Sequence, residues 1–135
     1  MASLMDLMRQ DSRLSVFASA IELSDLTSVL ATQSHLTVLA PTNLAFSMLS
    51  NNKMADWFGD IALLRQVIGH HLVAGRLHMQ QLIRMRSVYT LSGKVAEIVR
   101  DSTSVTVAGA QIEVCDRIAS NGILHVVARV LEPNA

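Results

Sequence analysis

The chain has 135 residues, and its 11 lysines and arginines balance 11 aspartates and glutamates. This length suits one domain that buries its own hydrophobic core. The balanced charge and the 4% aromatic content argue against a nucleic acid partner, and the single cysteine excludes an internal disulfide and a thiolate metal cluster.

The N-terminal third has the spacing of short amphipathic helices. Residues 1–10 lack the charged start and apolar block of an export signal, and no apolar run in the chain is long enough to cross a bilayer. Beyond them, apolar side chains recur at three- and four-residue spacing in two stretches: Leu14, Phe17, Ala18 and Ile21, then Leu26, Val29 and Leu30. Polar residues that can cap a helix precede each stretch, so we expect two short helices here.

Residues 36–46 (LTVLAPTNLAF) predict a buried strand that turns directly into a helix. Residues 36–40 are mostly apolar and favour β structure, while Pro41 holds Ala40 extended and ends the strand. The Thr42 hydroxyl is placed to cap the following helix, with Phe46 closing over its first turn.

The middle of the chain returns to helical periodicity. Residues 50–59 are polar and poorly periodic, so we expect a loop that Trp57 fastens to the body. From Asp60, apolar residues and His71 share one stripe of a longer helix that stops near Gly75. A shorter helix is expected around residues 79–83.

Beyond Arg86 the pattern changes from helical to alternating. Short β-type runs occupy residues 88–91, 94–100, 104–107, 111–116 and 123–131, separated by turn residues. Asn121 and Gly122 are read as a turn that needs a positive φ at the glycine. In the last run one face is wholly apolar and should meet the helices: Leu124, Val126, Ala128 and Val130. Helices first and antiparallel strands later, with one early strand returning to the sheet, predict an α+β domain.

Three stretches in this order resemble the fasciclin-type adhesion domain. Residues 36–46 are similar to the first motif of that family, with Leu39 where phenylalanine is usual. Residues 121–127, running on to residues 130–133, are similar to the second motif, and residues 70–77 are similar to its tyrosine-histidine segment. The resemblance covers nearly the whole chain and implies one such domain over residues 1–135, with a core from about residue 4 to residue 133.

The resemblance implies a wedge of two β-sheets with N-terminal and central α-helices packed alongside. It also implies a non-enzymatic module without cofactors that mediates cell adhesion or protein association in a secreted, periplasmic or cell-surface location. The expected partner is a protein or a cell-surface or matrix component. A homo-oligomer is an alternative, since Met5 and Met8 either cover the body or contact a second copy. Another alternative is a carrier of a small apolar molecule such as a carotenoid, lodged against methionine and leucine side chains between helix and sheet.

Site residues follow from the resemblance. The candidates for partner binding are His70, His71, Leu72, Val73, Asp116, Arg117 and Ile118. Histidine replaces the family's tyrosine at position 70, and Arg117 places a charge where an apolar residue is usual, which weakens the case for integrin-type recognition. The residues assigned to the structural motifs are Thr37, Pro41, Thr42, Asn43, Phe46, Asn121, Gly122 and His125.

The chemistry-bearing side chains favour structural roles. We expect His71 to be buried with a paired ring nitrogen, His70 to be exposed, and His125 to make a buried hydrogen bond. No metal site is expected, because adjacent histidines on a helix point about 100° apart and lack a carboxylate or cysteine at ligand spacing. Cys115 is expected to be a small buried apolar group. No nucleophile motif or phosphate-binding glycine loop occurs, so we expect no enzyme activity.

Overall fold

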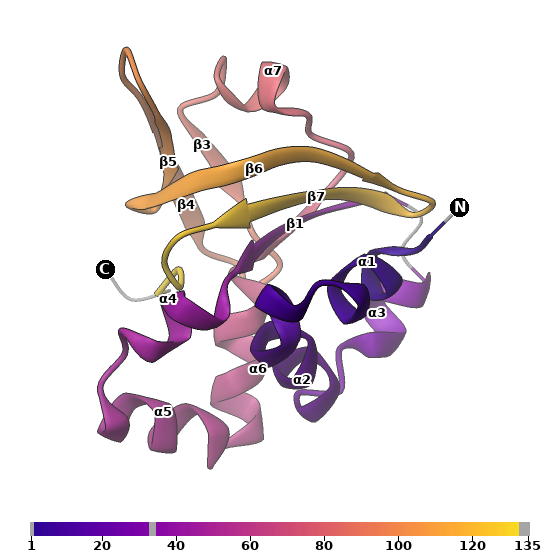
Figure 1. Cartoon of the computed structure of the whole chain (residues 1–135), viewed down its shortest axis with the longest axis vertical. Coiled ribbons are helices and arrows are strands. Elements are labelled where there is room, and N and C mark those ends of the chain that lie inside the picture. Colours follow the sequence, from indigo (N-terminus) through magenta and orange to yellow (C-terminus); the bar gives the residue numbers. More distant parts are fainter. Residues whose placement is uncertain (1, 33–34, 133–135) are drawn as a thin grey trace.

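The computed structural model describes residues 2–32 and 35–132, so Pro133, the last residue of the second motif, lies outside the described residues. The helices other than α7 form the lower layer of Figure 1, whereas the strands form the upper layer and α7 lies beside them at the top. The helical elements are α1 (Leu4–Gln10), the 3-10 helix η1 (Ser12–Leu14), α2 (Ser15–Leu23), α3 (Thr27–Thr32), α4 (Asn43–Ser47), α5 (Asn51–Phe58), α6 (Ile61–Gly69) and α7 (Met79–Leu82). The strands are β1 (Leu36–Pro41), β2 (Leu72–Ala74), β3 (Ser87–Tyr89), β4 (Val95–Arg100), β5 (Val105–Val107), β6 (Ala110–Ala119) and β7 (Gly122–Val127).

The strands form one seven-stranded mixed sheet in the order β2-β1-β7-β6-β5-β4-β3. The early strand β1 lies between β2 and β7 and runs parallel to β7, while the other neighbours are antiparallel. In Figure 1, β1, β6 and β7 run across the view and β3, β4 and β5 cross it steeply. The two sheets expected from the sequence are therefore two parts of one bent sheet, in an α+β fold.

The bend brings the first and last strands of this sheet together. Val73 forms an isolated bridge with Thr90, and the Leu91 amide donates to the Leu72 carbonyl at 2.9 Å. This contact covers part of both edges, where unpaired backbone groups would otherwise invite another strand.

The two faces of the sheet border separate hydrophobic clusters. Leu36, Val38 and Ala40 of β1 belong to the cluster under the helices, whereas Leu39 belongs to the cluster inside the bent sheet. This alternation follows from the two-residue period of a strand. Leu124, Val126 and Val130 pack into the helical cluster as predicted, and Ala128 is half-buried.

Several element boundaries are confirmed. Thr42 caps α4 by accepting the Ala45 amide at 3.2 Å, and Asp60 caps α6 by accepting the Leu63 amide at 3.2 Å. Pro41 is the last residue of β1, Phe46 is buried, and the short helix α7 lies where it was expected. The expected β runs after Arg86 all contain strands.

Other expectations are wrong. Residues 51–58 form helix α5 rather than a loop, because the Ser50 hydroxyl caps it and Trp57 is buried under it. Helix α6 ends at Gly69 instead of near Gly75, and the residues that follow form β2. Strand β7 ends at Val127 rather than at residue 131. The unexpected helix α1 starts with a capping box between Ser3 and Asp6.

Gly122 is structural for a different reason from the one expected. Its φ is not positive, and it is the first residue of β7, directly opposite Leu36 in the parallel ladder. A Cβ atom at this position would lie 2.0 Å from the Leu36 carbonyl oxygen and 2.9 Å from Leu4 Cδ1. Glycine is required here because β1 and β7 approach so closely.

No helix within residues 2–32 and 35–132 combines the length and the apolar character needed to cross a bilayer.

We expect Gly122→Ala to lower the free energy of unfolding by at least about 3 kcal/mol, because the new methyl group must push β1 and β7 apart. Urea unfolding followed by circular dichroism measures the change. Gly69→Ala is the matched control: its Cβ would lie 3.4 Å from the nearest atom, the Ser92 amide nitrogen, and should change stability by less than about 1 kcal/mol. Equal losses in the two variants would contradict the role assigned to Gly122.

Candidate functional site

The histidine pair lies at the end of α6. His70 is only 2% exposed, so the expectation that it is exposed is wrong. Its Nδ1 atom lies 3.1 Å from both Thr90 Oγ1 and Ser92 Oγ, because the β3–β4 turn folds over the ring. Burial, assisted by the nearby Lys94 ammonium, lowers the pKa of His70 below its ordinary value.

His71 is fully buried with both ring nitrogens paired, and the predicted burial is confirmed. Nδ1 donates to the Val67 carbonyl at 2.8 Å, and Nε2 accepts the Leu131 amide at 2.8 Å. The ring lies 5.5 Å from the centroid of Phe17. Burial lowers the pKa of His71 to about 3, so the ring is neutral at physiological pH and fastens α6 to the segment after β7.

The buried hydrogen bond expected for His125 is confirmed, and the ring makes two such bonds. Nε2 donates to the Leu77 carbonyl at 2.7 Å, and Nδ1 accepts the Asp116 amide at 3.2 Å. Burial lowers the pKa of His125. Because internal groups occupy both nitrogens, this ring joins β7 to β6 and to the approach to α7.

The motif residues Thr37, Asn43 and Asn121 join distant segments through paired hydrogen bonds. The Thr37 hydroxyl donates to the Gly75 carbonyl at 2.7 Å and accepts the Leu77 amide at 2.8 Å. The Asn43 side chain accepts the amide of Val16 at 2.9 Å and donates to the carbonyl of Ser12 at 3.0 Å. The Asn121 side chain accepts the Leu4 amide at 2.9 Å and donates to the Leu30 carbonyl at 2.7 Å. Asn121 thus ties the β6–β7 turn to α1 and α3, Asn43 ties α4 to η1 and α2 within the helical layer, and Thr37 ties β1 to the segment after β2.

The remaining candidates for partner binding fall into two groups. Leu72 and Val73 are buried in β2, with exposures of 0% and 5%. Asp116, Arg117 and Ile118 reach the surface of β6, where Ile118 is 46% exposed. The structure therefore separates one family segment, which it buries, from the other, which it leaves accessible.

The surface segment of β6 is shaped by a β-bulge. The register against β7 shifts between Val114 and Arg117, and Asp116 has a φ of 60°. The Asp116 carboxylate accepts the Met79 amide at 2.8 Å, and Arg117 donates to Asp11 at 3.2 Å. Both charged side chains are thus oriented by partners outside β6.

Cys115, within the same bulge, is exposed rather than buried as expected, because the bulge interrupts the alternation of the strand. Desolvation and the Asp116 carboxylate raise the pKa of its thiol, which keeps the thiol protonated at neutral pH.

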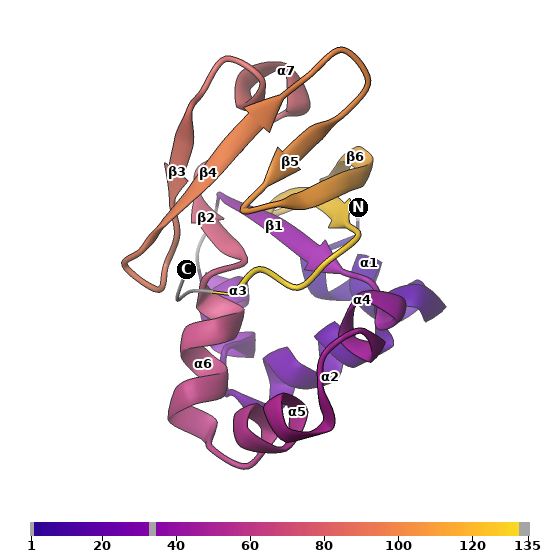
Figure 2. The ribbon, with the colours of Figure 1, turned by 90° about the vertical axis from the view of Figure 1, so that its left-hand side faces the viewer.

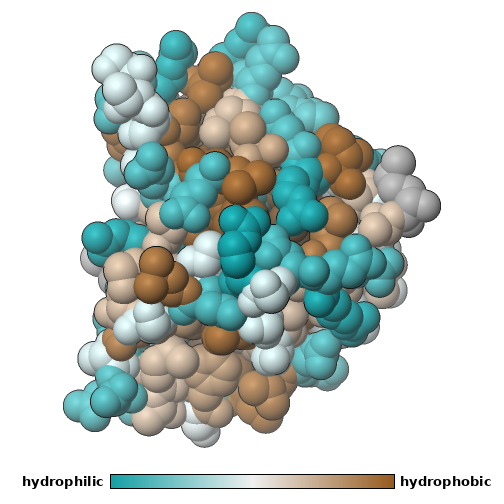
Figure 3. Space-filling view, viewed as in Figure 1, coloured by the Kyte–Doolittle hydropathy of each residue, from teal (hydrophilic) through white to brown (hydrophobic). Residues whose placement is uncertain are grey.

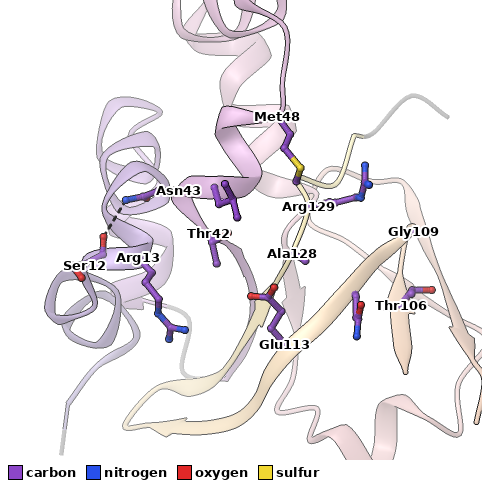
Figure 4. Close-up of a pocket in the computed structure, with 12 residues that line it drawn as sticks. Ser12, Arg13, Thr42, Asn43, Met48, Thr106, Gly109, Glu113, Ala128 and Arg129 are labelled. Carbon is purple, nitrogen blue, oxygen red and sulfur yellow. Dashed lines mark hydrogen bonds between the residues drawn. The ribbon is translucent and has the colours of Figure 1, made fainter. Parts of the chain in front are cut away.

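A groove that sequence analysis missed opens between α4 and the sheet (Figure 4). It has a volume of about 740 Å³ and draws its walls from η1, α4, the β5–β6 hairpin and the residues after β7. Leu44 and Met48, on α4 and its C-cap, are 72% and 52% exposed. Figure 3 shows that hydrophobic side chains reach this face in separate patches among hydrophilic ones, one of them on the side where α4 lies. The four-residue spacing of Leu44 and Met48 outside the apolar stripe is the signal that sequence analysis passed over.

The fold and these contacts define a small α+β domain whose family-motif side chains hold a helical layer against a bent sheet. Residues 12–133 match the fasciclin domain family, and the chain belongs to it.

Two kinds of relative support this assignment: long proteins of which the chain matches a small part, and a protein that it matches over nearly its whole length. The chain is 31% identical over 140 residues to the transforming growth factor-beta-induced protein ig-h3 of Sus scrofa and 30% identical over 135 residues to human periostin. The alignments include 100% and 98% of the chain but only 20% and 16% of those relatives. It is also 30% identical over 132 residues to the protein sll1735 of Synechocystis, covering 97% of the chain and 98% of that relative.

A solved structure shows the same fold. The FAS1 domain pair from the insect cell adhesion molecule Fasciclin I superimposes with a TM-score of 0.71 at 19% identity, covering 89% of the chain and 45% of that structure.

The three buried histidines should make the domain sensitive to mild acid. Because their folded-state pKa values lie below the ordinary value, the unfolded chain binds more protons than the folded chain below about pH 6.5. The free energy of unfolding should therefore be constant above that pH and fall between pH 6.5 and 5, by up to roughly 1.4 kcal/mol per pH unit for each histidine.

Urea unfolding at several pH values measures this slope. His71→Gln should reduce the slope by the share of one proton relative to the unmodified chain, because it removes one of the three buried rings. An unaltered slope in His71→Gln would refute the assignment of the acid sensitivity to this ring.

Proposed function

We propose that this chain is a non-enzymatic extracytoplasmic binding module that mediates cell adhesion or protein–protein association. Membership of the fasciclin domain family supports this, together with the likeness to a domain pair from a cell adhesion molecule. The buried histidines also support it, because His71 and His125 use both ring nitrogens internally and neither is free to act as an acid or base on a substrate.

The observation that carries the proposal is the accessible end of β6. Ile118 is an exposed apolar side chain next to the oriented charges of Asp116 and Arg117, and the His78 ring lies 3.7 Å from the Asp116 carboxylate. An apolar residue beside charged groups held in place by the fold is the composition of a protein-binding surface. The partner would be a protein or a cell-surface or matrix component.

The segment from His70 to Val73 has a different role in this proposal. Its side chains are at most 5% exposed, so partner contact would require the β3–β4 turn to open. We assign these residues to the frame that supports the surface, and recognition to residues 116–118.

Ile118→Gln should weaken attachment of immobilised protein to native cells or matrix by about tenfold, since it removes an apolar contact without touching the core. Surface plasmon resonance with the native matrix extract measures the loss. Ile61→Gln, at a similarly exposed helix position, is the matched control and should bind as the unmodified chain does. Unfolding midpoints of both variants should stay unchanged, and full binding by Ile118→Gln would remove this surface from consideration.

A second candidate function is carriage of a small apolar ligand such as a carotenoid. The groove favours it, because Leu44 and Met48 lie exposed where α4 faces the sheet. Protein purified from its native source should then absorb visible light, and Met48→Gln should reduce the bound polyene relative to Ile61→Gln. A colourless native protein would eliminate the carrier function and leave the binding module intact.

A further inference from the structure

A basin of about 450 Å³ lies over the exposed face of β4 and β5, beside the end of α6. Its lining includes His70 from the end of α6, alternate side chains of β4, and Glu132 from the segment after β7. Figure 2 shows the turn between β3 and β4 beside the end of α6, with the segment after β7 leading to the same place. Distant stretches of the chain therefore meet around one hollow.

His70 reaches this basin with one atom. The residue is 2% exposed and its Nδ1 is bonded to hydroxyl groups, whereas Nε2 has no hydrogen-bond partner among the described residues. Every fully buried side-chain nitrogen or oxygen in the described part of the chain has a partner, so Nε2 is not fully buried. Nε2 is thus the point at which an otherwise buried ring opens onto the basin.

The hydroxyl groups behind the ring determine what Nε2 offers. Nδ1 lies 3.1 Å from both Thr90 Oγ1 and Ser92 Oγ, which lie 2.7 Å apart, and Thr90 Oγ1 lies 2.8 Å from the Lys94 carbonyl. The two hydroxyl hydrogens can serve only two of these four contacts. A proton on Nδ1, shared between both hydroxyl oxygens, serves the other two. This assignment leaves Nε2 with its lone pair, as a hydrogen-bond acceptor facing the basin.

Carboxylates supply further acceptors in the lining. Glu97 is exposed on β4, and its side chain has no ion pair within the described residues. Glu132 pairs with Lys53 through one oxygen, which leaves the other oxygen open. Lys53 and Lys94 lie near the basin but do not line it, although the Lys94 ammonium helps to lower the pKa of His70. The charged side chains of the lining are therefore both anionic.

These acceptors are too dispersed for a single metal ion. In residues 2–32 and 35–132, no three His, Cys, Asp or Glu side chains are placed to hold one. A ligand with N–H donors on separate atoms matches this dispersion. A guanidinium group carries five such donors in a rigid fork, is charged at every physiological pH, and loses hydration more readily than an ammonium group.

Apolar side chains flank the carboxylate of β4. Val95 and Val99 lie two residues to either side of Glu97 on the same face of the strand, and they are 45% and 58% exposed. The aliphatic stem of a long cationic side chain packs well on such a surface. We propose that the basin binds the side chain of an arginine on the partner protein, with the guanidinium donating to His70 Nε2 and to the Glu97 carboxylate.

This proposal rests on the proposed function, because it names a chemical feature of the partner. It concerns a separate surface, since residues 116–118 do not line the basin. A broad contact with residues 70–73 would need the β3–β4 turn to open. The tip of one side chain does not, because the basin gives access to Nε2 from outside.

NMR titration of the ¹⁵N-labelled full chain with a blocked glycine-arginine-glycine tripeptide tests the site. The amide signals of β4 and of the β3–β4 turn should shift, with a Kd in the millimolar range expected of one side chain. The same tripeptide with citrulline, which keeps the shape but lacks the charge, should bind at least about tenfold more weakly. Tighter binding of the lysine tripeptide overturns the proposal and leaves a primary amine as the occupant.

Two variants separate the acceptors. Glu97→Gln should weaken tripeptide binding about fivefold, because it removes an exposed ion pair. His70→Asn should weaken it about tenfold, since its amide can still donate to the Thr90 hydroxyl but no atom replaces Nε2. Glu113→Gln is the matched control, because Glu113 is an exposed carboxylate on β6 outside the basin, and it should bind as the unmodified chain does. Circular dichroism should show all variants folded.

Absence of any shift up to about 50 mM tripeptide overturns the proposal, as does full binding by Glu97→Gln, which folds irrespective of the fate of His70→Asn. Attachment to native matrix is measured separately. A chain that attaches without binding the tripeptide loses only the arginine site. A chain that binds the tripeptide without attaching contradicts the binding module and retains the arginine site.

Discussion

The structure depends on the close parallel pairing of β1 with β7. The paired residues of these strands lie 86 positions apart in the chain, and the contact of Gly122 with the Leu36 carbonyl leaves no room for a side chain. Once the pair forms, β1 contributes alternate side chains to the helical cluster and to the cluster inside the bent sheet. Formation of both clusters therefore requires the same long-range strand pairing, and the helices and the late hairpins cannot complete their cores separately.

Buried polar side chains stabilise this pairing by bonding nearby backbone amides and carbonyls that have no partner in the sheet ladder. His71 receives the amide of Leu131 just after β7, His125 reaches the carbonyl of Leu77, and Thr37 bonds both Gly75 and Leu77. Each of these groups would be costly to bury unpaired, so the native contacts must form together. The same arrangement explains why acid should destabilise the fold, because protonating the His71 or His125 ring removes the nitrogen that accepts a backbone amide.

The features that the sequence predicted correctly are those that depend on residues close together in the chain. Caps at Thr42 and Asp60 and the alternating runs after Arg86 are local patterns, and they predicted real helix starts and strands. Helix α5 was not predicted, because its buried face is narrow and consists mainly of Trp57. The exposure of His70 was misjudged because the covering turn lies 20 residues further along the chain. The spacing of Leu44 and Met48 was a local signal of one apolar wall of the groove, but the groove as a whole could not be predicted, since its walls come from four separate stretches of the chain.

The separation of buried motif residues from exposed residues limits where on the molecule a partner can be recognised. The residues assigned to the structural motifs, from Thr37 to His125, are all buried or half-buried in the frame. A side chain that holds the frame cannot change without cost to folding, whereas Leu44, Glu97, Ile118 and Arg129 lie at the surface, outside that network of buried contacts. Two chains of this fold can therefore share the motifs and differ wholly in what they bind. We therefore expect the partner of an individual copy to depend on its surface residues rather than on the shared motifs.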